Sequence, residues 1–206
     1  MNIYAVIDTN VIISSMLTNN PYSPTKIVIN KIWENQIIPM INSEIMDEYC
    51  DVLSRSKFRF TETDILEMLS LLKFKGEEYT PEYIQKDFID PDDAIFYETY
   101  LMREDSYLVT GNLRHFPIEH RILAPSDIVN IIKLSENENN ILSEPKAVYT
   151  SDTKSNLLQR AWEAIERMRE SAVANGIADM PMEEIDEEIR KYREERKAKR
   201  MQEGKK

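Results

Sequence analysis

Acidic side chains stand in this sequence where several of them could bind a divalent metal ion together. Asp8 directly follows the apolar run Ile3–Ile7, which predicts a short strand buried on both faces. Residues 90–93, Asp-Pro-Asp-Asp, mark a helix start, and Glu48 lies within a predicted helix. Carboxylates brought close together raise one another's pKa unless a cation offsets their charge. Mg²⁺ or Mn²⁺ held by such oxygens could bind a phosphodiester, activate a water and stabilise the leaving oxygen.

Each of these acids also has an ordinary structural interpretation. Asp8 could cap the helix that follows it, Asp93 could do the same for its own helix, and Glu48 could be a solvent-facing helix residue. A cap needs one acid, whereas residues 90–93 supply three. With two histidines and one cysteine in the chain, a conventional zinc site is not expected.

The elements that must position these acids alternate between strands and helices. Strands are predicted at residues 3–7, 37–41, 106–110 and 121–124, and helices at about 9–17, 24–34, 43–54, 61–75, 91–101 and 126–134. This alternation predicts an α/β domain with a largely parallel sheet. Ligands of such sheets bind at the carboxyl ends of the strands, where Asp8 and Asn112 would lie.

The chain of 206 residues is long enough for one such domain and an appendage. We expect the domain to span residues 1–134, followed by a polar linker at 135–156 and a helical tail at 157–206. The spacing of apolar residues in the tail predicts two helices, of which the second has only a narrow apolar face. Two such helices cannot bury a core of their own, so they need a partner surface on the front domain or on another copy.

Charge and composition indicate the cellular compartment in which the protein is expected. Residues 1–140 carry the whole net charge of −11, whereas residues 141–206 sum to zero and their last part, residues 190–206, is strongly basic. The single Cys50 agrees with a reducing compartment, and the sequence lacks a long apolar run. We expect a soluble, cytoplasmic protein that does not enter a membrane.

A short basic strip lies between two predicted helices. Arg55, Lys57 and Arg59 alternate with Phe58 and Phe60, and such a strip could hold an RNA backbone and stack a base. It could equally be a solvated turn whose phenylalanines point inward.

Four segments taken together resemble the PIN domain, in the branch of toxins from toxin–antitoxin pairs. They are Asp8-Thr9-Asn10, Glu48 within residues 43–49, Asp90-Pro91-Asp92-Asp93, and Leu108-Val109-Thr110-Gly111-Asn112 with His115-Phe116-Pro117. The resemblance covers about residues 1–134. It implies a three-layer α/β/α fold with a mostly parallel sheet, and a metal-dependent endoribonuclease that uses Mg²⁺ or Mn²⁺ and leaves a 5′-phosphate.

The resemblance also assigns roles to residues. Asp8, Glu48 and Asp93 match the acidic triad, as metal ligands and catalytic residues, with Asp90 as a neighbouring acid. Thr9 and Asn10 would help to position Asp8 or its metal. The family often has a fourth acid where this chain has Asn112, and a neutral amide there could orient a water but adds no charge.

The tail resembles the C-terminal part of the small antitoxins that pair with these nucleases. The matching segments are residues 161–176, 182–189 and 193–196. This resemblance implies that the tail docks on a PIN surface, in the same chain or another, and restrains the nuclease. The expected partners are an RNA substrate, an antitoxin or the chain's own tail, and a second copy in a homodimer.

Two other functions remain open from the sequence. The chain could be a degenerate PIN domain that binds RNA or a protein partner without cutting, and Asn112 favours this alternative. It could also be a structure-specific nuclease that acts on DNA.

Overall fold

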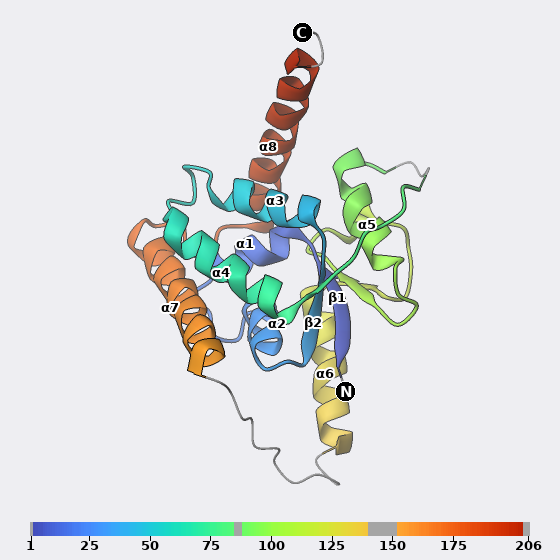
Figure 1. Ribbon diagram of the computed structural model, residues 1–206, viewed down its shortest axis with the longest axis vertical. Helices are drawn as coiled ribbons and strands as arrows, with labels where there is room; N and C mark the ends of the chain where they lie inside the picture. The colour runs from blue at the N-terminus through green and yellow to red at the C-terminus, as the bar shows by residue number, and fades with distance from the viewer. Residues whose placement is uncertain (1, 85–87, 140–151, 204–206) are drawn as a thin grey trace.

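The computed structural model describes residues 2–84, 88–139 and 152–203 (Figure 1). Five parallel strands form a sheet in the order β3-β2-β1-β4-β5. They are β1 (Ile3–Ile7), β2 (Ile37–Ile41), β3 (Glu77–Glu78), β4 (Tyr107–Val109) and β5 (Ile122–Leu123). The α-helices are α1 (Thr9–Leu17), α2 (Pro24–Trp33), α3 (Ser43–Leu53), α4 (Glu62–Lys75), α5 (Ala94–Tyr100), α6 (Pro125–Asn139), α7 (Asp152–Ala174) and α8 (Met182–Glu203).

The sheet is buried between helices, as its apolar strands require. In Figure 1 α1, α2 and α4 lie to one side of the central strands and α5 to the other. The predicted α/β fold with a mostly parallel central sheet is therefore confirmed.

The register of the central strands decides what meets at the carboxyl edge. Ile7 of β1 is paired with Val109 of β4, and the Asp8 N–H donates to the Val109 carbonyl at 2.8 Å. Since each strand ends there, Asp8 and Thr110 leave the sheet side by side. From Asp8 the chain continues into α1, and from Thr110 it continues into a loop with a short 3₁₀ turn at Leu113–His115. A second 3₁₀ turn, at Pro91–Asp93, precedes α5.

Three elements, β3, α6 and α7, differ from the sequence prediction. Strand β3 was not expected, because two glutamates carry no apolar signal. It is preceded by Gly76, where a Cβ would lie 2.6 Å from the Leu72 carbonyl oxygen and 2.8 Å from that of Pro39. Helix α6 continues to Asn139 and α7 starts at Asp152, so both run into the stretch read as a linker. The rest of that linker, residues 140–151, lies outside the described residues.

The tail packs on the front domain of the same chain. Helix α7 lies along α4 and also contacts α1, while α8 crosses α1 and α3 (Figure 1). Their apolar seams are fully or almost fully buried, including Ala161, Ile165 and Met168 of α7 and Ile185 of α8. The surface that the tail needs is thus supplied in cis. No helix in the described ranges has the length and apolar character needed to cross a membrane.

Candidate active site

Asp8 stands at the carboxyl end of β1 with only 4% of its surface exposed. Its Oδ2 accepts hydrogen bonds from the Thr110 hydroxyl at 2.6 Å and from the Asn10 amide at 3.1 Å. The side chain makes no capping bond to α1, although the residue occupies the cap position. The alternative that Asp8 is merely a helix cap is therefore wrong.

Glu48 reaches the same edge from the middle of α3. It is 2% exposed, which overturns the alternative of a solvent-facing helix acid. The Thr9 hydroxyl donates to Glu48 Oε1 at 2.6 Å. Thr9 therefore orients Glu48 rather than Asp8, a contact that depends on how α1 packs against α3 and that spacing along the chain does not reveal.

Asp93 and Asp90 come from the short 3₁₀ turn that precedes α5. Asp90 performs the capping, since its Oδ1 accepts from the Asp92 N–H at 3.1 Å, and Asp93 makes no capping bond. Asp93 is 2% exposed, and its Oδ2 lies 3.0 Å from His115 Nδ1. One acid of this segment thus folds the turn and leaves Asp93 to face the site.

Arg193 of α8 occupies the centre of these carboxylates. It donates to Glu48 Oε1 and Oε2 at 2.8 and 3.2 Å, to Asp93 Oδ1 at 2.7 Å and to Asp90 Oδ2 at 2.9 Å. The side chain is almost completely buried. Its planar guanidinium can satisfy several carboxylates at once, which a lysine could not do with the same geometry.

The strongly basic stretch at residues 190–206 is evident in the sequence, but it does not by itself single out Arg193. A usable signal existed. Arg193 follows the buried Ile185 and Ile189 by eight and four residues, so it lies on the same face of α8 as the apolar seam. A charged residue in phase with a buried face needs a buried counter-charge.

The ionisation of the acids reflects burial and this single arginine. Burial raises the pKa of Asp8 to about 7, helped by the charges of Asp93 and Glu48, while the Thr110 hydrogen bond and Arg193 oppose the rise. Burial also raises the pKa of Asp93, against the opposing charge of Arg193. For Asp90 burial acts upward, but Arg193 outweighs it and the pKa falls below its usual value.

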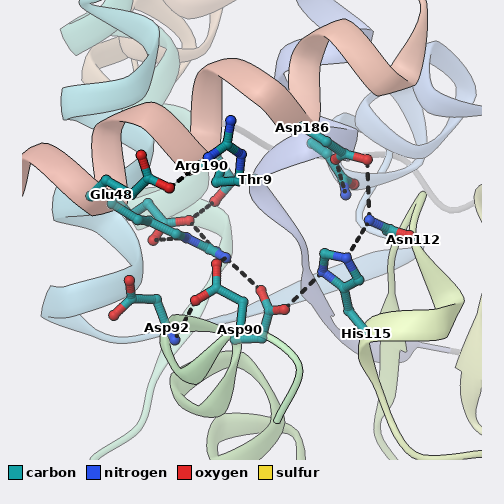
Figure 2. Close-up of polar contacts among 12 residues, drawn as sticks. Thr9, Glu48, Asp90, Asp92, Asn112, His115, Asp186 and Arg190 are labelled. Carbon is teal, nitrogen blue, oxygen red and sulfur yellow. Dashed lines mark hydrogen bonds and ion pairs between the residues drawn. The ribbon is translucent and has the colours of Figure 1, made fainter.

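A second residue of α8, Asp186, binds beside the acids (Figure 2). Asn10 Nδ2 donates to Asp186 Oδ1 at 3.2 Å, and Asn112 Nδ2 donates to Oδ2 at 3.1 Å. The Asn112 amide nitrogen also lies 2.9 Å from His115 Nε2. Because an amide N–H₂ can only donate, Nε2 of His115 accepts, and the ring proton sits on Nδ1 facing Asp93.

Lys197 extends the basic side of α8 past Arg193. Its Nζ lies 3.0 Å from Asp92 Oδ2 and 3.5 Å from Asp90 Oδ1. The Asp92 side chain is partly buried and paired. Together these contacts leave a cavity of about 460 Å³ between α8 and the carboxyl edge, lined by Asp8 and Asn112 on one side and by Asp186 and Arg193 on the other.

The basic strip lies beside this site and also contacts the tail. Arg55 pairs with Glu188 and Glu195, Lys57 with Glu184, and Arg59 with Asn175. Phe58 is completely buried and Phe60 stacks on it at a centroid distance of 6.1 Å. Phe58 therefore cannot stack a base, and the alternative of inward-pointing phenylalanines holds for it.

A PIN domain family model matches residues 4–114, more than half of the chain, so the chain belongs to the PIN domain family. PIN domains are generally nucleases and typically use divalent metal ions. The match includes the elements that carry Asp8, Glu48, Asp93 and Asn112, and it ends before the tail. No curated protein and no solved structure matches the chain.

The donor set is suitable for a hard cation, with one qualification. Within residues 2–84, 88–139 and 152–203 no group of three or more His, Cys, Asp or Glu is spaced to hold a metal ion. The cation at the centre of the site is instead the Arg193 guanidinium, which pairs with Glu48, Asp90 and Asp93. Carboxylates that already surround one cation are ligands of the kind that hard divalent ions prefer.

Proposed function

We propose that the chain is a metal-dependent endoribonuclease, the toxin component of a toxin–antitoxin system, held inactive by its own antitoxin-like tail. The observation that carries this proposal is the burial of Asp8, Glu48 and Asp93 around a single cation that α8 supplies. A protein that needed these acids only for folding would gain nothing from packing them together, because their mutual repulsion must be offset.

In the active form Asp8, Glu48 and Asp93 would hold Mg²⁺ or Mn²⁺, with Asp90 in support. The ion would supply a water of lowered pKa and charge stabilisation for the leaving oxygen of the phosphodiester. Thr110 and Asn10 hold the Asp8 carboxylate in one orientation, and Thr9 does the same for Glu48. Asn112 and His115 flank the site as hydrogen-bonding groups that can orient a water or a phosphate oxygen.

The restraint follows from the contacts of α8. Arg193 neutralises the acids that would bind the metal, and the helix covers the carboxyl edge where RNA would have to enter. Removing Arg193 alone would leave several buried carboxylates without a counter-ion, a loss of about 3–5 kcal/mol for a broken buried pair. Such a change would release α8 and expose a site with an intact ligand set.

The test is Mn²⁺-dependent cleavage of a mixed RNA panel by the full chain and by Arg193→Ala. We expect weak cleavage by the parent, strong cleavage by Arg193→Ala, and none when Asp8→Asn is added to it. Arg190→Ala is the matched control, because Arg190 lies on the same helix but pairs with Glu187 and Glu194 of α8 itself. The proposal fails if the α8 amides of Arg193→Ala lose their protection from hydrogen exchange and the variant still cuts no RNA.

A second candidate function is a PIN domain that binds RNA or a partner without cutting. It is favoured by Asn112, which adds no charge to the site. Mn²⁺ binding by Arg193→Ala without turnover would identify it. Cleavage of structured DNA but not RNA in the same panel would instead indicate a DNA-directed nuclease.

The proposal also covers the domain division, the localisation and the oligomeric state of the protein. It divides the chain into a nuclease domain at 1–134, a linker at 135–156 and a tail at 157–206, and it places the protein in the cytoplasm as a homodimer. Light scattering of the purified full chain would test the oligomeric state.

A further inference from the structure

Helix α8 presents opposite charges to two neighbouring surfaces. Toward the acidic site it directs the cations Arg193 and Lys197. Toward the basic strip it directs three carboxylates, those of Glu184, Glu188 and Glu195. The helix therefore supplies a cation where a metal ion would bind and anions where a chain of phosphates would run.

The contacts of Arg55 have the geometry of phosphate recognition. Its Nη1 and Nη2 donate to the two oxygens of Glu195 at 2.9 and 3.2 Å, while Nε donates to Glu188 at 3.0 Å. A guanidinium that binds two carboxylate oxygens in parallel fits two phosphate oxygens equally well. The backbone here is fixed, because the Phe58 N–H donates to the Arg55 carbonyl and the Phe58 ring is buried.

Helix α8 covers both the strip and the acidic site, which lie on different sides of it, and Arg55 pairs with residues on either side of Arg193 along the helix, Glu188 and Glu195. Glu184 and Glu188 are one helical turn apart, about 6 Å along the axis, and Arg193 follows Glu188 by about 7.5 Å. Glu184 contacts Lys57, and Arg193 contacts the acid cluster. A single extended strand laid where α8 now lies would pass the strip and reach the carboxylates.

We propose that Arg55 and Lys57 bind the phosphates of the RNA strand next to the scissile bond, and that Glu184, Glu188 and Glu195 of α8 imitate those phosphates. This inference rests on the proposed nuclease function. The competing explanation is that the ion pairs serve only to anchor the tail. The two explanations differ in the RNA affinity expected after the strip cations are removed. Removal frees the tail in both cases, but only under the proposal does it also take away contacts to the RNA.

The experiment compares two full-chain variants in the inactive Asp8→Asn background. One changes the strip, Arg55→Gln with Lys57→Gln, and the other changes the tail, Glu184→Gln with Glu188→Gln and Glu195→Gln. Hydrogen exchange of α8 reports tail release, and a fluorescein-labelled single-stranded RNA of mixed sequence reports binding in Mg²⁺. We expect both variants to lose protection of α8, the tail variant to bind RNA several-fold more tightly, and the strip variant to bind it no better than the background protein.

Adding Arg193→Ala to every protein removes the competition by the tail. In that series the strip variant is expected to bind RNA several-fold more weakly, and to lose about 1.4 from the slope of log affinity against log salt for two phosphates on a single strand. The tail variant is expected to match its parent. Equal tightening by strip and tail variants, or an unchanged salt slope, would overturn the inference alone. No RNA binding by any tail-released protein would overturn the proposed RNA nuclease as well.

Discussion

Asn112→Asp is expected to expel α8 by placing a carboxylate against a carboxylate. The Asn112 amide now donates to Asp186 Oδ2 at 3.1 Å, and an aspartate would lose that hydrogen bond to a charged group. This loss costs about 1.5–3 kcal/mol. Two unit charges about 4 Å apart at an effective dielectric of about 20 repel by about 4 kcal/mol, which is an upper bound because one acid can take a proton.

Proton uptake by Asp186 would relieve part of this repulsion, since burial already raises the pKa of Asp186. We therefore expect a net weakening of α8 docking by about 2–4 kcal/mol at neutral pH, a shift of roughly 30- to 1,000-fold in the docking equilibrium. Hydrogen exchange of the α8 amides at low protein concentration measures this shift. The effect should shrink as the pH falls, because the two carboxyl groups can then share a proton.

The exchanged pair, Asn112→Asp with Asp186→Asn, supplies the decisive control. It restores one amide facing one carboxylate, with the donor on the tail instead of the domain, and should recover most of the protection. Asp186→Asn alone should cost less than Asn112→Asp, because no like charges meet. Unchanged α8 protection in Asn112→Asp, or no recovery in the exchanged pair, would refute the reasoning about this contact.

Three further predictions concern stability. Burial raises the pKa of Asp8 from 3.8 to about 7, so the folded state binds the Asp8 proton more tightly than the unfolded state does. The resulting contribution to the free energy of unfolding is full below about pH 4 and is lost as pH rises through 7. In urea unfolding, Asp8→Asn should make the free energy of unfolding fall less steeply over this pH range. Gly76→Ala should destabilise the fold by about 1–3 kcal/mol in the same assay, because its Cβ would collide with two backbone oxygens. Trp162→Ala should expose α7 to exchange and cost about 2–3 kcal/mol, since the ring lies 5.1 Å from Trp33.

The parts of the fold that could be predicted from sequence were those with a local signal. Apolar runs at residues 3–7 and 37–41 stand out, and an acid directly after a buried strand indicates the carboxyl edge. Strand β3 was missed because it forms only by pairing with Met40 and Ile41 at the edge of the sheet. The burial of Phe58 was undecidable because an alternating pattern of cations and aromatics fits a turn and a binding strip equally.

The candidate site likewise contains residues that could be predicted from the sequence and residues that could not. Asp8 and Asp93 could be proposed from their positions at element ends, and Glu48 from the resemblance to the PIN domain, but their convergence is a property of the strand order. The partners that orient them could not be assigned, as Thr9 shows by bonding to Glu48 across 39 positions of sequence. Arg193 required the helical phase of α8 to be compared with the charge of a distant pocket.

Arg193 and the acids it neutralises belong to one polypeptide, and this has a consequence for dosage. An inhibitor made as a separate protein dissociates on dilution and must be produced in the right ratio to its target. A covalently joined one faces its site at an effective concentration in the millimolar range that does not depend on expression level. If the tail restrains a nuclease as proposed, one translation event delivers blocker and catalyst in equal number, and release would come from a competing ligand or from damage to the chain and not from an imbalance in synthesis.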